Sequence, residues 1–496
     1  MPRKRIILAV WIALSSPAWA GTQPISCTDF LAWVSAGVSS HYLGELLSEH
    51  APSFLPDAEL VKQVEAAGVD KRLTEELVKR SPSTGATACS AESLAALREM
   101  QAQDYHRAAR SFRALLAENP GSAALHVALG TVLLDDGDVD GASDEFSAAK
   151  ELMPGSSEIH SRLAYVLLRS EDSEGAIAES RTALSIDPQN GEAYRYLGLA
   201  LGASGLYPAA LHAFQESLRR EPQSADTYYD MGITLSEKGD SVAAAGAYRQ
   251  AIAIQPRFWQ AHNNLGMVLH DLKEFDAAIA EYKQAKRTAP GELTVRNNLG
   301  NTYCDKGDYD EAIAEYRDLY RMNPDWPHGH SCLARAYMAR RDYQSALPEL
   351  RRAVQESPMS GAEHRVLGQV LLLLHQPSEA LHELRLAVAL GPDSPLAHHY
   401  LGTALLDSND FDSAVVEFRE AVRLEPTAGN HYYLAGCLAR LGRYDDALSE
   451  LDLASRLDPG QSTYRTMKQA VLRIKASPTH PAIPDFGLNE GSALDK

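Results

Sequence analysis

The chain has 496 residues, of which 45% are hydrophobic and 23% are charged, proportions typical of a folded protein with a substantial core. Its formal net charge is −19. A chain this acidic is repelled by nucleic acids and by anionic membrane surfaces, so its charge argues against both as partners.

The first 20 residues have the pattern of a secretory signal peptide. Basic residues at 3–5 precede an apolar run at 6–14, and residues 18–20 (AWA) supply the small side chains that a signal peptidase reads. We expect cleavage near Ala20 and export to the periplasm or out of the cell. Loss of the three basic residues changes the net charge from −19 to −22. No later segment predicts a membrane-spanning helix, so direct membrane insertion is not expected.

Residues 21–88 are expected to form a small helical domain of about four short helices. Gly37 and Gly68 each lie where a helix C-cap is expected, and Ser39 and Asp70 follow as N-cap residues of the next helices. The segment contains no motif of an enzyme.

The chain has five cysteines, and an exported protein can form disulfides. Cys27 and Cys89 flank the N-terminal segment and are a candidate disulfide pair. Cys304, Cys332 and Cys437 fall within expected helices, where we interpret them as small core or groove residues.

From residue 89 to residue 461 the sequence repeats with a period of 34 residues. The period is marked by Pro120, Pro154, Pro188, Pro222, Pro256, Pro290, Pro324, Pro358, Pro392 and Pro426, and Pro459 follows one residue early. If each proline is position 32, position 20 is alanine in all eleven repeats and position 8 is glycine in seven. Small residues there let two helices approach closely, and large apolar residues at positions 7, 11 and 24 fill the space between neighbours. Each proline ends the second helix.

This pattern resembles the tetratricopeptide repeat, in the form found in exported bacterial proteins. The resemblance implies an all-α fold, a right-handed α-solenoid of about eleven helix-turn-helix repeats, without catalytic activity. The first repeat departs from the pattern at Ala95, Ala96 and Glu99, and we expect it to be degenerate. Residues 462–476 predict a capping helix, and residues 477–496 predict a disordered tail.

The first helix of each repeat has a buried face and a variable face. At 100° per residue, positions 4, 7, 8 and 11 share one arc, and positions 2, 5, 6, 9, 12 and 13 share the opposite arc. In the tetratricopeptide family the second arc lines the concave groove in which peptides bind. The candidate groove residues are Asn263, Asn264, Asn297, Asn298, Asn301, Arg335 and Tyr229.

Side-chain amides both donate and accept hydrogen bonds, so a row of them can hold a peptide backbone of any sequence. The asparagines resemble the ladder in the repeat domain of the O-linked N-acetylglucosamine transferase family, which implies the same use here. The alternative is that asparagine is simply common at positions 5 and 6 of such repeats.

Other patterns fit the scaffold better than a chemical site. Histidine recurs at position 4, but neighbouring repeats stack about 10 Å apart, too far for two rings to share a metal ion with bonds of about 2 Å. We interpret these histidines as partly buried rings that replace an aromatic residue. Asp136, Asp138 and Asp140 begin like a calcium loop, which then fails at Ser143 and Ser147.

No nucleotide-binding, metalloprotease or hydrolase motif occurs, so we predict no catalytic site, cofactor or metal. The favoured function is a non-catalytic scaffold that binds an extended protein or peptide segment in the groove. Two alternatives stay open. One is a structural subunit of a cell-envelope complex that uses its convex face and N-terminal domain, and the other is an enzyme within residues 21–88. The sequence does not predict the oligomeric state.

Overall fold

A computed structural model describes residues 24–82, 89–327 and 329–476, so the predicted signal peptide and C-terminal tail lie outside the described residues. The described part contains 27 α-helices and no strand, and one isolated bridge pairs Ile25 with Pro52. Two compact units divide at Pro256, between the fifth and sixth repeats. The all-α solenoid predicted from the period is confirmed.

Four helices precede the repeats, and each repeat then contributes a first helix (A) and a second helix (B). The N-terminal helices are α1 (Cys27–Ser35), α2 (Ser40–Glu49), α3 (Ala58–Ala66) and α4 (Lys71–Arg80). The A helices are α5 (Ala91–Gln101), α7 (Ala123–Asp135), α9 (Ser157–Arg169), α11 (Gly191–Ala203), α13 (Ala225–Glu237), α15 (Trp259–Asp271), α17 (Leu293–Lys306), α19 (His330–Ala339), α21 (Gly361–Leu373), α23 (Pro395–Asp407) and α25 (Ala428–Arg440). The B helices are α6 (Tyr105–Glu118), α8 (Val139–Leu152), α10 (Ser173–Ile186), α12 (Tyr207–Arg220), α14 (Ser241–Ile254), α16 (Phe275–Thr288), α18 (Tyr309–Met322), α20 (Tyr343–Glu356), α22 (Pro377–Leu390), α24 (Phe411–Leu424) and α26 (Tyr444–Leu457). The last helix is α27 (Ser462–Ala476).

Local sequence sets the ends of these helices. Ser39 caps α2 by accepting a hydrogen bond from the Tyr42 amide at 3.2 Å, and Asp70 caps α4 by accepting one from the Arg72 amide at 2.7 Å. Gly37 ends the preceding turn with φ of 66°, a left-handed value that glycine adopts without strain. Each B helix ends shortly before its position-32 proline, as expected from the ring geometry.

The glycine at position 8 makes room for the large side chain at position 24 of the same repeat. A Cβ atom built on Gly198 would lie 2.7 Å from the Phe214 ring, and one on Gly266 would lie 2.8 Å from the Tyr282 ring. Both distances are far below van der Waals contact. The small residue therefore sets the packing of the A helix on the B helix, because the ring occupies the volume of the missing side chain.

The position-4 histidines have a polar role that the sequence interpretation missed. Their Nδ1 atoms lie 2.5–2.7 Å from a glutamate oxygen at position 23 of the same repeat. The pairs are His126–Glu145, His160–Glu179, His262–Glu281, His330–Glu349, His364–Glu383, His398–Glu417 and His431–Glu450. These glutamates are therefore only partly exposed and contact a ring of the same repeat.

The sequence itself carries the signal for this pairing. Repeats four and five have Tyr194 and Tyr228 at position 4, and both have alanine at position 23. Repeat seven has Arg296 at position 4 and Glu315 at position 23, which lie 3.5 Å apart. A basic residue at position 4 thus occurs with a glutamate at position 23, and the pair ties the A helix to the B helix.

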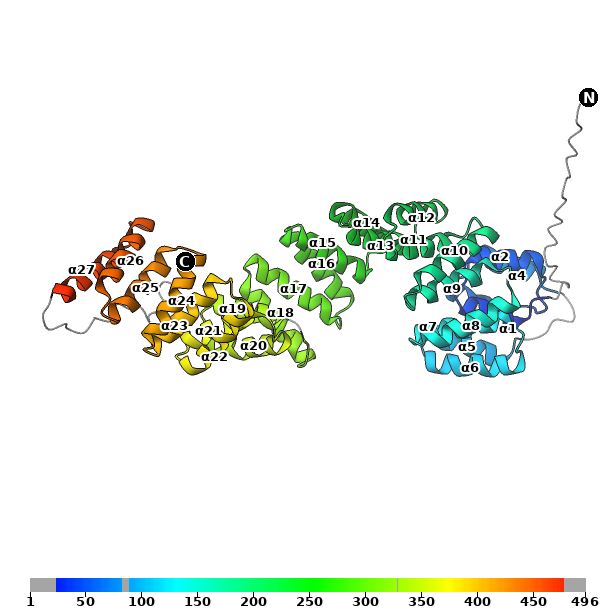
Figure 1. Cartoon of the computed structure of the whole chain (residues 1–496). Helices are drawn as coiled ribbons and strands as arrows, with labels where there is room; N and C mark the ends of the chain where they lie inside the picture. The colour runs from blue at the N-terminus through cyan, green and yellow to red at the C-terminus, as the bar shows by residue number, and fades with distance from the viewer. Residues whose placement is uncertain (1–23, 83–88, 328, 477–496) are drawn as a thin grey trace, which may run out of the picture. The chain divides into compact units, whose positions relative to one another are not determined.

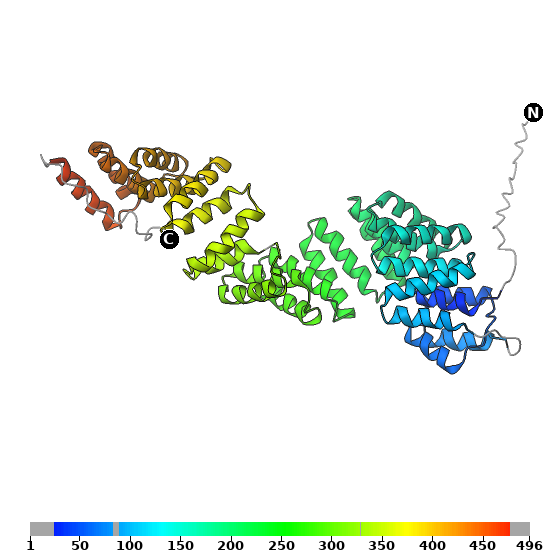
Figure 2. The ribbon, with the colours of Figure 1, turned by 90° about the horizontal axis from the view of Figure 1, so that it is seen from below.

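The N-terminal helices do not form a body of their own. Residues from Cys27 to Val166 belong to one continuous hydrophobic core, so α1–α4 share their core with the first three repeats. Helix α1 packs on α5 and α7, and the blue N-terminal helices lie beside the cyan repeats in both views (Figures 1 and 2). The division of the chain at residue 88 into a small helical domain and a repeat array stays a prediction. Helices α5 and α6 also pack together, so the degenerate first repeat is a complete helix pair.

Candidate functional site

In the first repeats the variable face of the A helices is already occupied. Ala124, Val127 and Ala128 are positions 2, 5 and 6 of the second repeat, and each is at most 3% exposed. Their burial follows from the contact of α1 with α7. A partner cannot reach this part of the groove while α1 is in place.

Polar contacts fix the N-terminal helices on this face. The Ser122 hydroxyl donates a hydrogen bond to Asp29 at 2.5 Å, and the hydroxyls of Thr28 and Ser93 lie 2.9 Å apart. Cys27 and Cys89 form a disulfide, with their Cα atoms 5.2 Å apart. The start of α1 is therefore held to the first repeat by a covalent bond as well as by packing.

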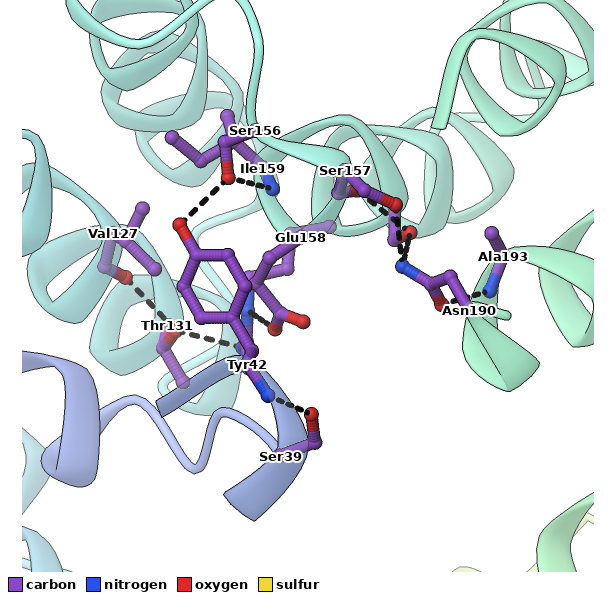
Figure 3. Close-up of polar contacts among 12 residues, drawn as sticks. Ser39, Tyr42, Val127, Thr131, Ser156, Ser157, Glu158, Ile159, Asn190 and Ala193 are labelled. Carbon is purple, nitrogen blue, oxygen red and sulfur yellow. Dashed lines mark hydrogen bonds and ion pairs between the residues drawn. The ribbon is translucent and has the colours of Figure 1, made fainter. Parts of the chain in front are cut away.

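Helix α2 is the N-terminal helix that contacts the repeats farther along this face, and it reaches the third repeat. The Tyr42 hydroxyl reaches Ser156 at 2.9 Å, at the start of α9 (Figure 3). The neighbouring Asn190 donates hydrogen bonds to the hydroxyls of Ser157 at 2.8 Å and Ser161 at 3.0 Å, and so joins the third repeat to the fourth (Figure 3). The side chains named here all form hydrogen bonds within the protein, which indicates that they stabilise the fold.

A polar pocket of about 770 Å³ opens between α2 and the start of α9 and α11. Its lining contains six acidic residues together with Arg219 and Arg220. The lining acidic residues are Glu45, Glu49, Glu158, Asp187, Glu192 and Glu221. Burial raises the pKa of Glu158, whose carboxylate accepts a hydrogen bond from Arg162 at 2.7 Å. Burial and the charge of Glu192 raise the pKa of Glu221.

Other polar and aromatic residues of the N-terminal unit are also engaged within it. Arg195 on α11 forms an ion pair with Asp230 on α13 at 3.1 Å. Tyr229, a predicted groove residue, is half-buried and has its ring 5.8 Å from that of Tyr248. Arg162 and Arg195 therefore both have acidic partners within this unit.

In the C-terminal unit the asparagines form a connected patch over α15 and α17. The side chain of Asn298 donates a hydrogen bond to Asn263 Oδ1 at 3.1 Å, and Asn263 donates to Asn264 Oδ1 at 3.2 Å. Asn263 is only 6% exposed, so it supports the patch from beneath. Asn297 is also set back, because its Oδ1 is buried and accepts no hydrogen bond from a described residue.

Asn298 and Asn301 line a pocket of about 180 Å³. Met267, His270, Asp271, Tyr282 and Thr302 complete its lining. Asn301 Oδ1 accepts a hydrogen bond from the Tyr316 hydroxyl, which leaves its Nδ2 without a described partner. Asn298 uses its Nδ2 to reach Asn263, which leaves its Oδ1 without one. The pocket therefore presents one amide donor and one amide acceptor three residues apart on α17.

A row of polar contacts crosses this face beside the pocket. Asp305 lies 3.3 Å from His270 Nε2 of the sixth repeat and 2.5 Å from Arg335 of the eighth repeat. The Arg335 side chain is 54% exposed, so it keeps much of its surface for solvent or a partner. Met267, His270 and Asp305 occupy positions 9, 12 and 13, which the helical arc predicts to face the groove, although they were not among the candidate residues.

Comparisons with known proteins agree with this architecture. Family profiles described as tetratricopeptide repeat match residues 161–226, 229–292, 333–395 and 401–462, and a second one matches residues 99–164. A profile described as TPR repeat matches residues 300–340. The matched segments together cover more than half of the chain.

Several solved structures are similar to parts of the chain. MamA is 26% identical over 35% of this chain and 94% of its own, with a TM-score of 0.31. YrrB, described as a TPR protein with an unusual peptide-binding site, is 22% identical over 45% of this chain and 99% of its own, with a TM-score of 0.28. A chain of the APC/C Cut9–Hcn1 hetero-tetramer is 16% identical over 80% of this chain and 92% of its own, with a TM-score of 0.37.

A comparison with curated protein sequences finds no match. Among the described helices, none is both long and apolar enough to span a bilayer. Repeat arrays of this kind present extended surfaces that bind other proteins and typically carry no catalytic activity. The profile matches and the helix-pair architecture show that this chain belongs to the tetratricopeptide repeat family and is a non-catalytic protein–protein interaction scaffold.

Proposed function

We propose that the protein binds an extended segment of a partner protein across α15, α17 and α19, with Asn298 and Asn301 in contact with the peptide backbone. The carrying observation is the donor and acceptor pair at the 180 Å³ pocket. Asn301 Nδ2 can donate to a peptide carbonyl, and Asn298 Oδ1 can accept from a peptide N–H group. One asparagine pair thus matches the two polar groups of a peptide backbone.

The surroundings of the pair suit such a ligand. Met267 is 47% exposed and offers a flexible apolar surface for side chains of varied shape. Arg335 adds a cation near the same face, and it can bind a carboxylate of the partner in addition to Asp305. We expect binding that depends on an extended backbone and only weakly on its sequence.

The test uses peptides selected from a random library on the purified protein, with affinity measured by fluorescence anisotropy. The double substitution Asn298→Ala and Asn301→Ala removes two hydrogen bonds of about 1 kcal/mol each, so we expect affinity to fall at least tenfold. Gln355→Ala is the matched control, because Gln355 is an exposed amide on B helix α20 of the same unit.

Equal binding by the wild-type and double-variant proteins would contradict the groove model. It would favour the structural-subunit alternative, in which partners contact the outer helices. Asn264→Ala added to the double variant distinguishes a wider patch from a single pocket, because the affinity then falls further only if the patch is used as a whole.

We also propose that the protein acts outside the cytoplasm. The basic, apolar and small-residue pattern of residues 1–20 supports export. A disulfide between Cys27 and Cys89 is of the kind that forms in oxidising compartments. N-terminal sequencing of the protein from the periplasmic or external fraction should give a chain that starts near Gly21. A chain that retains residues 1–20 in the cytoplasm would contradict the proposal.

A further inference from the structure

Two unbonded cysteines of neighbouring repeats meet beside the candidate groove. Cys304 is position 12 of the seventh repeat on α17, and Cys332 is position 6 of the eighth repeat on α19. The Cys304 thiol donates a hydrogen bond to the backbone oxygen of Cys332 at 3.3 Å, so the two cysteines are direct neighbours. Cys304 is 3% exposed and Cys332 is half-buried, so the second sulfur is the one that solvent reaches.

A guanidinium group faces both sulfurs. Arg335 Nε lies 3.3 Å from Cys304 Sγ, and Arg335 Nη2 lies 3.8 Å from Cys332 Sγ. The same Nη2 donates a hydrogen bond to Asp305 Oδ1 at 2.5 Å, which helps to fix the orientation of the guanidinium group. An arginine stays charged at all physiological pH values, so it can stabilise a thiolate here permanently.

The charge state of the pair follows from these contacts. Hydrogen bonds from Cys332 and then from Arg335 lower the pKa of Cys304 to about 7. The interaction with Cys304 raises the pKa of Cys332 above its usual range. The pair therefore loses its first proton at a lower pH than an ordinary cysteine does.

The third free cysteine, Cys437, lies in a different environment from Cys304 and Cys332. Cys437 on α25 is fully buried, and burial raises its pKa to about 12. Burial in apolar surroundings makes a thiol inert, whereas a nearby guanidinium and a second thiol are the features of reactive sites. The repeat array thus contains one inert thiol, Cys437, and one pair of thiols, Cys304 and Cys332, with the features of a reactive site.

We propose that Cys304 and Cys332 are a redox-active dithiol that exchanges with a small external disulfide and closes a disulfide bond between α17 and α19. In the first step Cys332 passes its proton to the Cys304 thiolate and attacks one sulfur of the external disulfide. That S–S bond breaks, a mixed disulfide forms on Cys332, and one small thiolate leaves.

In the second step the proton on Cys304 goes to solvent or to the released thiolate. The Cys304 thiolate attacks Cys332 Sγ, the mixed disulfide breaks, and the second small thiolate leaves. The two protein thiols are oxidised by two electrons in total, and the external disulfide is reduced to two thiols. The new bond joins the A helices of two repeats on the face that carries Asn301 and Arg335.

The test is a redox titration of the full chain in mixtures of reduced and oxidised glutathione. Remaining thiols are alkylated, and the peptides are mapped by mass spectrometry without reduction. We expect a Cys304–Cys332 linked peptide to accumulate as the oxidised form increases, while Cys437 is alkylated only after denaturation. Full alkylation of Cys304 and Cys332 at every glutathione ratio would overturn the proposal, and so would a link that forms only between two molecules.

Variants separate the roles of the groups. Cys332→Ser should abolish the link, and Cys437→Ser should leave its rate of formation unchanged. Arg335→Gln should slow its formation at pH 7 about fivefold, because a pKa increase of one unit from about 7 lowers the thiolate fraction at pH 7 from about one half to about one eleventh. The wild-type rate should level off above about pH 7, the titration range of Cys304, and not near pH 8.5, the usual pKa of a free cysteine.

Circular dichroism of each variant establishes that it is folded before its rate is compared. An unchanged rate in a folded Arg335→Gln variant would contradict the assigned activation. If Cys332→Ser does not fold, Cys332→Ala and the wild-type pH profile decide the same question, because a rate that follows the pH profile of an ordinary thiol contradicts a coupled pair.

Discussion

The A-helix face has opposite uses in the second and seventh repeats. In the second repeat, Val127 and Ala128 at positions 5 and 6 are fully buried by the packing of α1 on α7. In the seventh repeat, Asn297 and Asn298 stand at the same positions, and Asn298 lines an open pocket. Both repeats present an A helix there, and the difference lies in the apolar or amide side chains at positions 5 and 6 and in the covering helix α1.

The comparison also shows how the chain protects one end of its array. An exposed apolar face on the first repeats would attract other apolar surfaces. Helix α1 covers that face, and the Cys27–Cys89 disulfide holds it in place. Terminal repeats of solenoids need such a cover because they lack a neighbour on one side.

Exchanging residues between the two faces should give the largest effect. Ala128→Asn places an amide in a filled core, and we expect a loss of about 3–5 kcal/mol from the buried polar group and overpacking together. Asn298→Ala removes one hydrogen bond and should cost about 1 kcal/mol. Urea unfolding monitored by circular dichroism measures both. Similar losses for the two variants would remove the distinction between the faces.

Removal of the disulfide should have the next largest effect. The pair Cys27→Ala and Cys89→Ala should destabilise the N-terminal unit by about 2–4 kcal/mol, because the open chain gains conformational freedom when unfolded. Limited proteolysis should cleave residues 24–82 sooner, while cleavage within 257–476 is unchanged. Equal protease resistance of the variant and wild-type proteins would mean that packing alone holds α1.

Loss of the Tyr42 hydroxyl should have a smaller effect. Tyr42→Phe removes the hydrogen bond to Ser156 and should cost about 0.5–1.5 kcal/mol. Tyr165→Phe is the matched control, since the Tyr165 hydroxyl bonds to no described residue and its ring stacks on Tyr196. If the free energy of unfolding falls by the same amount in both variants, the hydrogen bond between Tyr42 and Ser156 does not stabilise the fold.

The smallest effect is a dependence on pH. Hydrogen bonding by Glu145 raises the pKa of His126, and Glu179 raises that of His160 although burial opposes it. A raised histidine pKa stabilises the fold fully below the unfolded pKa, and this stability is lost as the pH rises through the folded pKa. We expect a loss of about 1 kcal/mol or less per pair as the pH rises above about 6.5, the usual pKa of histidine.

Unfolding of the N-terminal unit across this pH range measures the effect. Glu145→Gln together with Glu179→Gln should flatten the profile, because the neutral amide no longer favours the charged ring. A profile that keeps its slope in this double variant would assign the dependence to other groups.

The fold could be predicted because the residues that pack one helix pair recur at the same positions in every repeat. Ala108 and its counterparts at position 20, with the prolines at position 32, fix the helix pairs. The docking of α1 could not be predicted this way, since the contact of Asp29 with Ser122 is made once and leaves no period. One signal was available. Residues 123–134 (AALHVALGTVLL) are apolar on both faces, which predicts a helix that is buried on both sides.

The site could be predicted to the level of position and no further. The helical arc identified positions 5, 6 and 9, and therefore Asn298 and Asn301. It could not show that Asn263 is buried beneath Asn298, because both asparagines lie within the same predicted arc. Side-chain hydrogen bonds between repeats depend on distances that the sequence does not contain.

The contact of α2 with α9 has a consequence for the order of folding. Tyr42 and Ser156 are 114 residues apart in the chain, whereas the two helices of one repeat adjoin within 34 residues. During synthesis, α2 must wait for the third repeat before it can form this contact, while each later repeat can add to the preceding one at once. We expect the slowest refolding phase to belong to the closure of α1 and α2 on the first repeats, and a chain that begins at residue 89 to lack it.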